Sequence, residues 1–319
     1  MTHQNPSSPL PLRLRRSAPL RERASALMLM IWAILFMSLT VMGVVEYIGY
    51  SVSEATLANA EFRAFYLAES GLAVGLHPST RRGDTCLKQK IGTDSGFDVV
   101  INYEGARIPI NFLVDSRLSE SVSNLFVYWG LTAEQASVAV ESLADWMDND
   151  NEPRPNGAES GYYESLGIYD MPRQLGFINV DEMLLVRGMN VVDRLKPDWR
   201  EYFSVYGDGV IDLRTAFKDV LMAVSGSNEG DVDNFISRRD GGDGIAGTED
   251  DQRISDSEAF RLLGIDGDRA AALRTTLTSE DAVRRITSTG YVGEKRAQII
   301  VIVRRGEDRS LTYLARLEE

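Results

Sequence analysis

An acidic stretch in the middle of the chain has the residue types and the spacing of a calcium-binding loop. Counted from Asp148, its carboxylates occupy positions 3, 5 and 12, which are Asp150, Glu152 and Glu159. In calcium loops, alternating oxygens wrap the ion and a terminal glutamate closes the shell with both of its oxygens. We therefore expect calcium ligands at Asp148, which is position 1, and at these three further positions, with Asp145 as an additional candidate.

The stretch departs from a standard EF-hand at two points. Position 6 is Pro153, where the EF-hand has glycine, and Tyr162 and Tyr163 follow in place of an obvious exiting helix. No cysteine or histidine lies nearby, so zinc is not expected. The residues alone leave one alternative open, which is an acidic loop that is solvated by water and binds no ion.

A second acidic run, residues 240–251, is a secondary candidate for cation binding. Its glycines allow tight backbone turns, and its carboxylates could chelate calcium. An ordinary surface loop between helices explains the same composition equally well. The candidate ligands are Asp240, Asp243, Glu249, Asp250 and Asp251.

The sequence shows no constellation of catalytic residues. The two histidines are His3 and His77, and Cys86 is the single cysteine, so a nucleophilic triad could be built only through His77. The stretch Gly-Tyr-Val-Gly-Glu-Lys at 290–295 is too degenerate for a phosphate loop. Paired carboxylates are abundant, as in glycosidases, but an acidic chain supplies them by chance. We therefore expect a protein that is not an enzyme.

The distribution of charge argues against nucleic acid as a main partner. Five arginines against one glutamate give residues 1–24 a charge of +4, which leaves −17 for the rest of a chain whose total is −13. Binding to a phosphate backbone needs clustered lysine and arginine. A rival hypothesis remains, because Arg187 and Arg194 lie near glycine turns between helices, as in DNA-binding helix–hairpin–helix modules.

An uncharged apolar run, Ala24–Val45, follows the arginines and is long enough to cross a bilayer core of about 30 Å. The positive-inside rule places the N-terminus in the cytoplasm and the C-terminal bulk across the membrane. Because no proline interrupts the pattern before residue 76, we predict one helix with a transmembrane half, 25–45, and a soluble half, 46–76. A classical cleaved signal peptide fits poorly, while an uncleaved signal anchor remains an alternative.

The soluble half of this helix carries an apolar stripe with spacings of three and four residues. The stripe consists of Leu57, Ala60, Ala64, Leu67, Gly71 and Val74. Its small residues would allow close packing, either on neighbouring helices or on the protein's own sheet.

Strands are predicted near both ends of the soluble region and helices between them. β-branched and aromatic residues indicate strands at 97–103, 107–112, 285–290, 298–304 and 311–317. A helical region at 118–146 is divided by a stop at Gly130 and a cap at Thr132, and shorter helices are expected within 180–195 and 212–226. The fold class is therefore α+β, with a mostly antiparallel sheet and a helical middle.

Arg21–Leu27 with the apolar run that follows resembles the signal of type IV pilins and type II secretion pseudopilins. The resemblance implies that a prepilin peptidase removes the leader, residues 1–24, by cutting between Ala24 and Ser25, and that the new N-terminus is methylated. Ala24 departs from the glycine that is usual at this cut. Leu29, the fifth residue after it, stands where most pilins have glutamate, and minor pseudopilin K is similar in lacking it.

Further segments are similar to the minor pseudopilin K family: the acidic loop at 145–163, residues 181–189, and residues 206–226. That family carries calcium in the region of the acidic loop, so the resemblance implies calcium here. It also implies a pilin-like fold, in which a long N-terminal helix packs on a sheet built from 97–112 and 284–319. A large helical domain, residues 113–283, would be inserted into that sheet.

The same resemblance implies a position at the tip of the type II secretion pseudopilus. The subunit would initiate or cap assembly and support protein export across the outer membrane. Its partners would be minor pseudopilins I and J, with H and the major pseudopilin below them. It would be a single-pass protein of the inner membrane with its bulk in the periplasm. The alternative is a membrane-anchored, pilin-like surface protein that binds DNA.

Overall fold

The computed structural model describes residues 20–114, 118–244, 250–279, 281–306, 308 and 310–318. Side chains of residues 20–25 and 51–58 are outside this description, as are residues 1–19 of the predicted leader. The chain forms two compact units, Met1–Asn59 and Ala60–Glu319.

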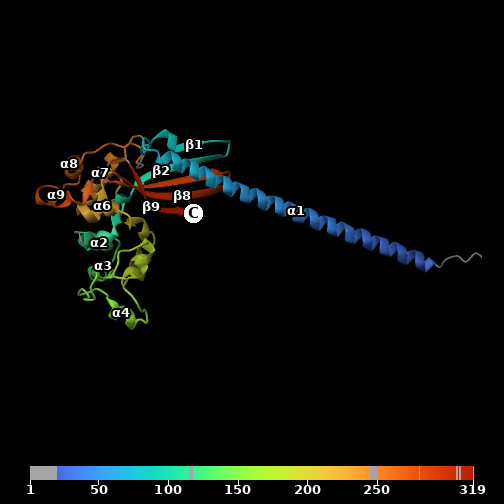
Figure 1. Cartoon of the computed structure of the whole chain (residues 1–319), viewed down its shortest axis with the longest axis horizontal. Coiled ribbons are helices and arrows are strands. Elements are labelled where there is room, and N and C mark those ends of the chain that lie inside the picture. Colours follow the sequence, from blue (N-terminus) through green and yellow to red (C-terminus); the bar gives the residue numbers. More distant parts are fainter. Residues whose placement is uncertain are drawn as a thin grey trace, which may run out of the picture. The chain divides into compact units, whose positions relative to one another are not determined.

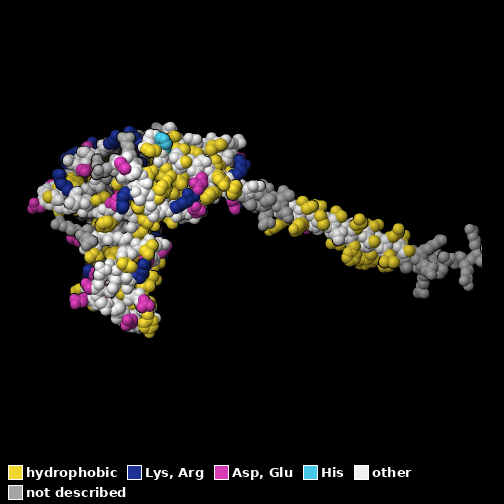
Figure 2. Space-filling model, in the orientation of Figure 1, with side chains coloured by type: hydrophobic (Ala, Val, Ile, Leu, Met, Phe, Trp, Pro, Cys, Tyr) yellow, Lys and Arg dark blue, Asp and Glu magenta, His cyan; other side chains and the backbone are white. Residues whose placement is uncertain are grey.

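One helix, α1 (Leu20–Leu76), contains the predicted apolar run and the predicted soluble helix (Figure 1). Within the first unit, Ala26–Tyr50 is long and apolar enough to span a membrane. Its large apolar side chains are exposed. They form the yellow surface of the helix in Figure 2. An apolar surface of this length without protein cover fits a bilayer as its solvent.

The second unit contains a five-stranded antiparallel sheet with the strand order β1-β2-β7-β8-β9. The strands are β1 (Lys88–Lys90), β2 (Ser95–Tyr103), β7 (Val283–Val292), β8 (Lys295–Arg305) and β9 (Leu311–Glu318). Sequence segments from both ends of the soluble region therefore meet, because β2 pairs with β7 along its whole length. Alternate residues of β2 are buried, as the period of two requires.

The last turns of α1 pack on one face of this sheet. Ala64, Ala68 and Leu72 are buried there, and the Ser288 hydroxyl donates to the Ala68 carbonyl oxygen at 2.7 Å. A Cβ on Gly71 would overlap side chains of β2 and β7. The predicted stripe is thus confirmed at Ala64 and Gly71.

Other members of the predicted stripe deviate. Leu67 and Val74 are only half-buried, and the side chain of Leu57 is outside the described residues. The buried positions repeat every three or four residues from Ala64. The buried face includes Ala68 and Leu72, which the predicted stripe did not contain.

The prediction of a sheet strand at 107–112 was wrong. Only Ile108–Pro109 is a strand, β3, and it pairs in parallel with β4 (Phe203–Ser204), outside the large sheet. The chain leaves the sheet at Glu104, which is fully buried and accepts from the Nε of Arg285 at 2.6 Å and from Ser204 Oγ. Proline has no N–H to continue a ladder. The insertion therefore begins near residue 104, not at 113.

The chain between β2 and β7 is mainly helical, as predicted, and Figure 1 shows its helices gathered at one end of the sheet. Thr132 caps α3 with a complete capping box, and Gly130, at φ 101°, follows the end of α2. The α-helices are α2 (Leu118–Tyr128), α3 (Ala133–Met147), α4 (Ser160–Ser165), α5 (Met189–Leu195), α6 (Lys218–Ser225), α7 (Glu229–Arg239), α8 (Asp256–Leu262) and α9 (Gly267–Leu273).

Short elements complete this region. Among the described residues they include the 3-10 helices η2 (Glu104–Ala106), η3 (Ile110–Phe112), η4 (Val180–Leu185) and η5 (Trp199–Tyr202), while a further one, η1 (Thr85–Leu87), lies outside the region, directly before β1. A second parallel pair joins β5 (Ile211–Asp212) to β6 (Leu277–Thr278). The core of the region is built around large side chains with little or no exposure, among them Trp146, Trp199, Phe126 and Phe203.

Candidate metal centre

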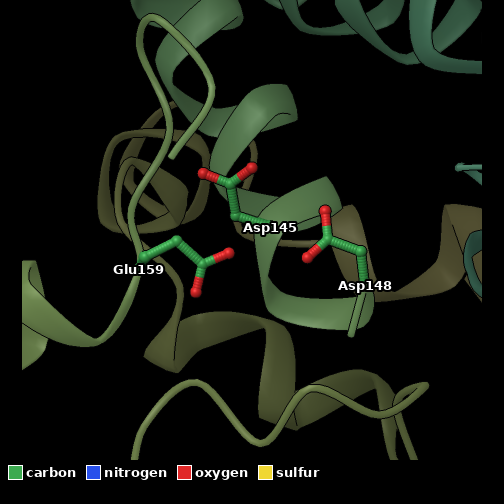
Figure 3. A group of neighbouring side chains, drawn as sticks. All are labelled: Asp145, Asp148 and Glu159. Carbon is green, nitrogen blue, oxygen red and sulfur yellow. The ribbon is translucent and has the colours of Figure 1, made fainter. Parts of the chain in front are cut away.

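Three of the five predicted ligands come together. Oxygen atoms of Asp145, Asp148 and Glu159 all lie within 4.8 Å of one another. Figure 3 shows Asp148 and Glu159 pointing toward the space between them, with Asp145 beside it. Asp145 lies in the last turn of α3 and Asp148 directly follows that helix, so a spacing of three places both on one face. Glu159 immediately precedes α4.

The intervening loop folds back tightly onto α3. A Cβ at Gly157 would overlap the Asp145 carboxylate, so only glycine allows this approach. The Gly157 carbonyl accepts from Arg187 Nη1 at 3.0 Å, and the Asn156 backbone N–H donates to Glu141 Oε2 at 2.7 Å. These contacts bring Glu159 to the helix end that carries both aspartates.

Arg154 is a member of the carboxylate cluster that the sequence did not predict. Its Nη1 lies 2.5 Å from Asp145 Oδ1 and 2.5 Å from Asp148 Oδ2. Its guanidinium thus offsets part of the negative charge of the cluster. A cation bound to these carboxylates would compete with Arg154, whose half-exposed side chain can move toward solvent. The signal in the sequence was an arginine inside a loop otherwise rich in carboxylates.

Glu159 has the least satisfied carboxylate of the cluster. The residue is 3% exposed, and neither of its oxygens has a hydrogen-bond partner among the described residues. Burial, with the charges of Asp145 and Asp148, raises the pKa of Glu159 to about 7. A buried carboxylate without a partner is costly when it ionises, and a divalent cation would stabilise its charged form. The oxygen donors fit the preference of calcium.

The structure does not bring Asp150 and Glu152 into this cluster. Both are exposed, and Asp150 Oδ1 accepts from the backbone N–H of Glu152 at 2.9 Å. The reason is Pro153, whose fixed φ prevents the turn by which an EF-hand wraps successive carboxylates around its ion. The negative charge of Asp150 still contributes to the raised pKa of Glu159.

The second acidic run does not assemble a group of three ligands among its described residues. Asp240 is buried and accepts from Arg239 Nε at 2.7 Å. Asp250 Oδ2 accepts from the backbone N–H groups of Gly242 and Asp243, at 2.7 and 3.1 Å. A carboxylate oxygen of Asp251 lies 3.7 Å from Arg82. Glu249 lies outside the described residues.

The arginines of the DNA-binding hypothesis contact the chain itself. Besides its bond to Gly157, Arg187 stacks on Tyr162 with its Cζ 4.8 Å from the ring centroid. Arg194 Nε donates to the Asn190 carbonyl oxygen at 3.2 Å. This geometry does not favour a phosphate-binding surface around these glycine turns.

His77, the histidine on which a catalytic triad would depend, lies in an exposed turn at the end of α1. Its Nδ1 is 2.7 Å from Ser79 Oγ, two residues along the chain. No hydrogen bond in which this ring donates to a carboxylate is found among the described residues. Such a local pair explains the contact without catalysis.

Comparison with known proteins identifies the helical region. Residues 106–198, which contain all three clustered carboxylates, match the family described as type II secretion system (T2SS), protein K. That family is a structural component of a secretion apparatus. No curated protein matched the chain.

A solved structure shares the fold. A chain of the GspK-GspI-GspJ complex from enterotoxigenic Escherichia coli matches with a TM-score of 0.60 and 15% sequence identity. The match covers 85% of this chain and 99% of that one. The family match covers residues 106–198, and the structural match shows a fold in common with a chain of the GspK-GspI-GspJ complex.

Proposed function

We propose that this chain is a tip subunit that initiates and caps the type II secretion pseudopilus, and so supports protein export across the outer membrane. The observation that carries the proposal is the match of residues 106–198 to T2SS protein K. The shared fold with a chain of the GspK-GspI-GspJ complex supports I-like and J-like minor pseudopilins as its partners. Minor pseudopilin H and the major pseudopilin would follow below them. The role is mechanical, and no catalysis is assigned to it.

Leu29 supports a terminal position. In pilins, the glutamate at this point pairs with the free N-terminus of a neighbouring subunit. Leu29 lies in α1 with an exposed apolar side chain and offers no such carboxylate. A subunit that cannot form this pair is poorly suited to repeated addition. The inserted helical domain adds bulk beside the sheet that would hinder stacking of a further subunit.

The proposal includes insertion into the inner membrane. Ala26–Tyr50 would span the bilayer, and the arginines before it would keep the N-terminus in the cytoplasm. The second unit, Ala60–Glu319, would then lie in the periplasm. We also propose that Asp145, Asp148 and Glu159 hold calcium, which would fasten the loop at 148–159 to α3.

Processing by a prepilin peptidase is expected to yield a mature chain that starts at Ser25 with a methylated N-terminus. Intact mass spectrometry of the chain purified from membranes, after expression with the peptidase, measures this directly. Ala24→Gly restores the usual residue and should give complete cleavage, whereas a large residue in Ala24→Leu should block it. A chain that retains Met1–Ala24 in the presence of an active peptidase would indicate a simple signal anchor.

The tip position predicts that the full chain in detergent retains I-like and J-like minor pseudopilins in a pull-down. The exposed face of α1 offers a contact, since Phe62 and Tyr66 are 60% and 55% exposed and pack edge to face with their ring centroids 4.6 Å apart. Phe62→Ala with Tyr66→Ala should weaken recovery of the partners. Tyr313→Ala is the matched control, because this 62% exposed aromatic lies on β9 instead. Recovery of neither partner, with salt-sensitive retention of DNA, would support the rival function.

A further inference from the structure

A basic pocket in the second unit has no role in the function proposed above. Its cavity, of about 370 Å³, is lined by residues from the end of β2, the start of β7, the end of β8 and the turn after β5. Three of the lining side chains are arginines: Arg214, Arg284 and Arg305. This clustering is notable because the chain outside residues 1–24 carries a charge of −17.

Two of these guanidinium groups are available to a ligand. Arg214 forms an ion pair with the buried Asp212. The side chains of Arg284 and Arg305 are half-buried, and no hydrogen bond or ion pair to either is found among the described residues. An arginine held at a pocket wall without a partner presents a planar fork of donors suited to an oxyanion.

Tyr103 holds two of the arginines in place. The Cζ atom of Arg214 lies 4.2 Å from the Tyr103 ring centroid, and that of Arg284 lies 5.8 Å from it. Stacking on the aromatic ring orients the guanidinium groups before any ligand arrives. Such preorganisation lowers the entropy that binding must overcome.

One carboxylate also lines the pocket. Asp281 is 7% exposed, and its two oxygens accept from the backbone N–H groups of Gly105 and Val283, at 2.7 and 2.9 Å. Its charge offsets one of the two unpaired guanidinium groups of Arg284 and Arg305. The lining therefore keeps about one positive charge in excess, which matches one carboxylate group better than a phosphate of charge about −2.

We propose that this pocket binds a carboxylate-bearing ligand between Arg284 and Arg305. The cavity is larger than a single carboxylate group and reaches the size of small ligand sites. The carboxylate could belong to a small free organic acid or to an acidic residue of a bound polypeptide. Both sources would be recognised by the same charge-assisted hydrogen bonds.

Isothermal titration calorimetry on the full chain in nonionic detergent tests this proposal with three probes: butyrate, which carries one carboxylate, a hexaglutamate peptide and inorganic phosphate. We expect butyrate or the peptide to bind at one site per chain. Arg284→Gln and Arg305→Gln should each weaken this binding about tenfold, the loss expected when one charged hydrogen-bonding group is removed. Arg296→Gln is the matched control, since Arg296 is an exposed residue near the opposite end of β8.

The outcomes separate the sources. Tighter binding of the peptide than of butyrate would assign the carboxylate to a polypeptide, and equal or weaker binding would assign it to a small acid. The proposal is overturned if no carboxylate probe binds, if phosphate binds more tightly, or if Arg296→Gln weakens binding as much as the pocket variants. Unchanged thermal melting of each variant shows that a loss is not caused by unfolding.

Discussion

Replacing Gly290 with alanine is expected to lower the free energy of unfolding of the second unit by about 3 kcal/mol, the upper range for overpacked sites. Gly290 lies in β7, where this strand passes beneath α1. A Cβ there would overlap the carbonyl oxygen of Ala64 and the backbone nitrogen of Ala68. Backbone atoms inside a helix cannot rotate away as a side chain would, so helix and sheet must separate.

Thermal unfolding of the full chain in detergent, followed by circular dichroism, measures this loss. Gly161→Ala is the matched control, because nothing lies within 4 Å of a Cβ at that position of α4. Alanine there should be neutral or stabilising by up to about 1 kcal/mol, since glycine is the poorer helix former. Equal stability of the two variants would show that α1 does not pack on the sheet as described.

Calcium is expected to stabilise the chain, and Glu159→Gln is expected to abolish this effect. A ligand at a hundredfold excess over its Kd stabilises the folded state by about 2.7 kcal/mol. The amide of glutamine keeps the shape of Glu159 but removes the charge and the bidentate closure that calcium requires. Melting temperatures measured with calcium and with a chelator give the comparison.

Without calcium, Glu159→Gln is expected to raise the melting temperature at alkaline pH. The folded-state pKa of Glu159 is raised from 4.5 to about 7, chiefly by burial and then by Asp145. Its stabilising contribution is therefore complete below pH 4.5 and is lost as pH rises through 7, where the folded chain must ionise a buried group. In chelator, Glu159→Gln should melt at a higher temperature than the parent chain at pH 8, and should lose this part of the pH dependence.

Glu152→Gln is the control for the calcium experiment. Glu152 lies in the same loop and is acidic, but it is exposed and outside the cluster. Its substitution should leave the calcium response intact. A calcium response that disappears with Glu152→Gln as well as with Glu159→Gln would instead support the ligand spacing of an EF-hand. A parent chain whose melting is the same in calcium and in chelator would exclude the site altogether.

Periodic segments were the part of the fold that the sequence predicted well. The apolar run and the stripe beyond it indicated one helix, and α1 extends from Leu20 to Leu76. The runs of β-branched residues near the C-terminus became β7, β8 and β9. Such segments succeed because local propensity and burial favour the same structure. The prediction of a strand at residues 107–112 failed because a buried ion pair at Glu104 and a proline outweighed the strand-like composition of this segment.

The candidate metal centre was predicted only in part. Spacing along the chain indicated Asp148 and Glu159, and the helical period explains why Asp145 joins them. Asp150 and Glu152 share the loop but point elsewhere, since the path of the backbone after Pro153 decides which carboxylates converge. The close approach of Gly157 to Asp145 has no signature in sequence, because it depends on a loop folding onto a preceding helix.

By itself, the sequence determined the features that depend on neighbouring residues: the membrane-spanning length of the apolar run Ala24–Val45, the long helix, the C-terminal strands and the acidic loop. Only the tertiary structure decided which residues meet across long separations. In the tertiary structure, β2 pairs with β7, and α1 packs against β7 at Gly290. Three of the five predicted carboxylates come together, and Arg284 and Arg305 line one pocket. The reason is physical: periodicity and propensity act over a few residues, whereas convergence depends on packing between segments far apart in the chain.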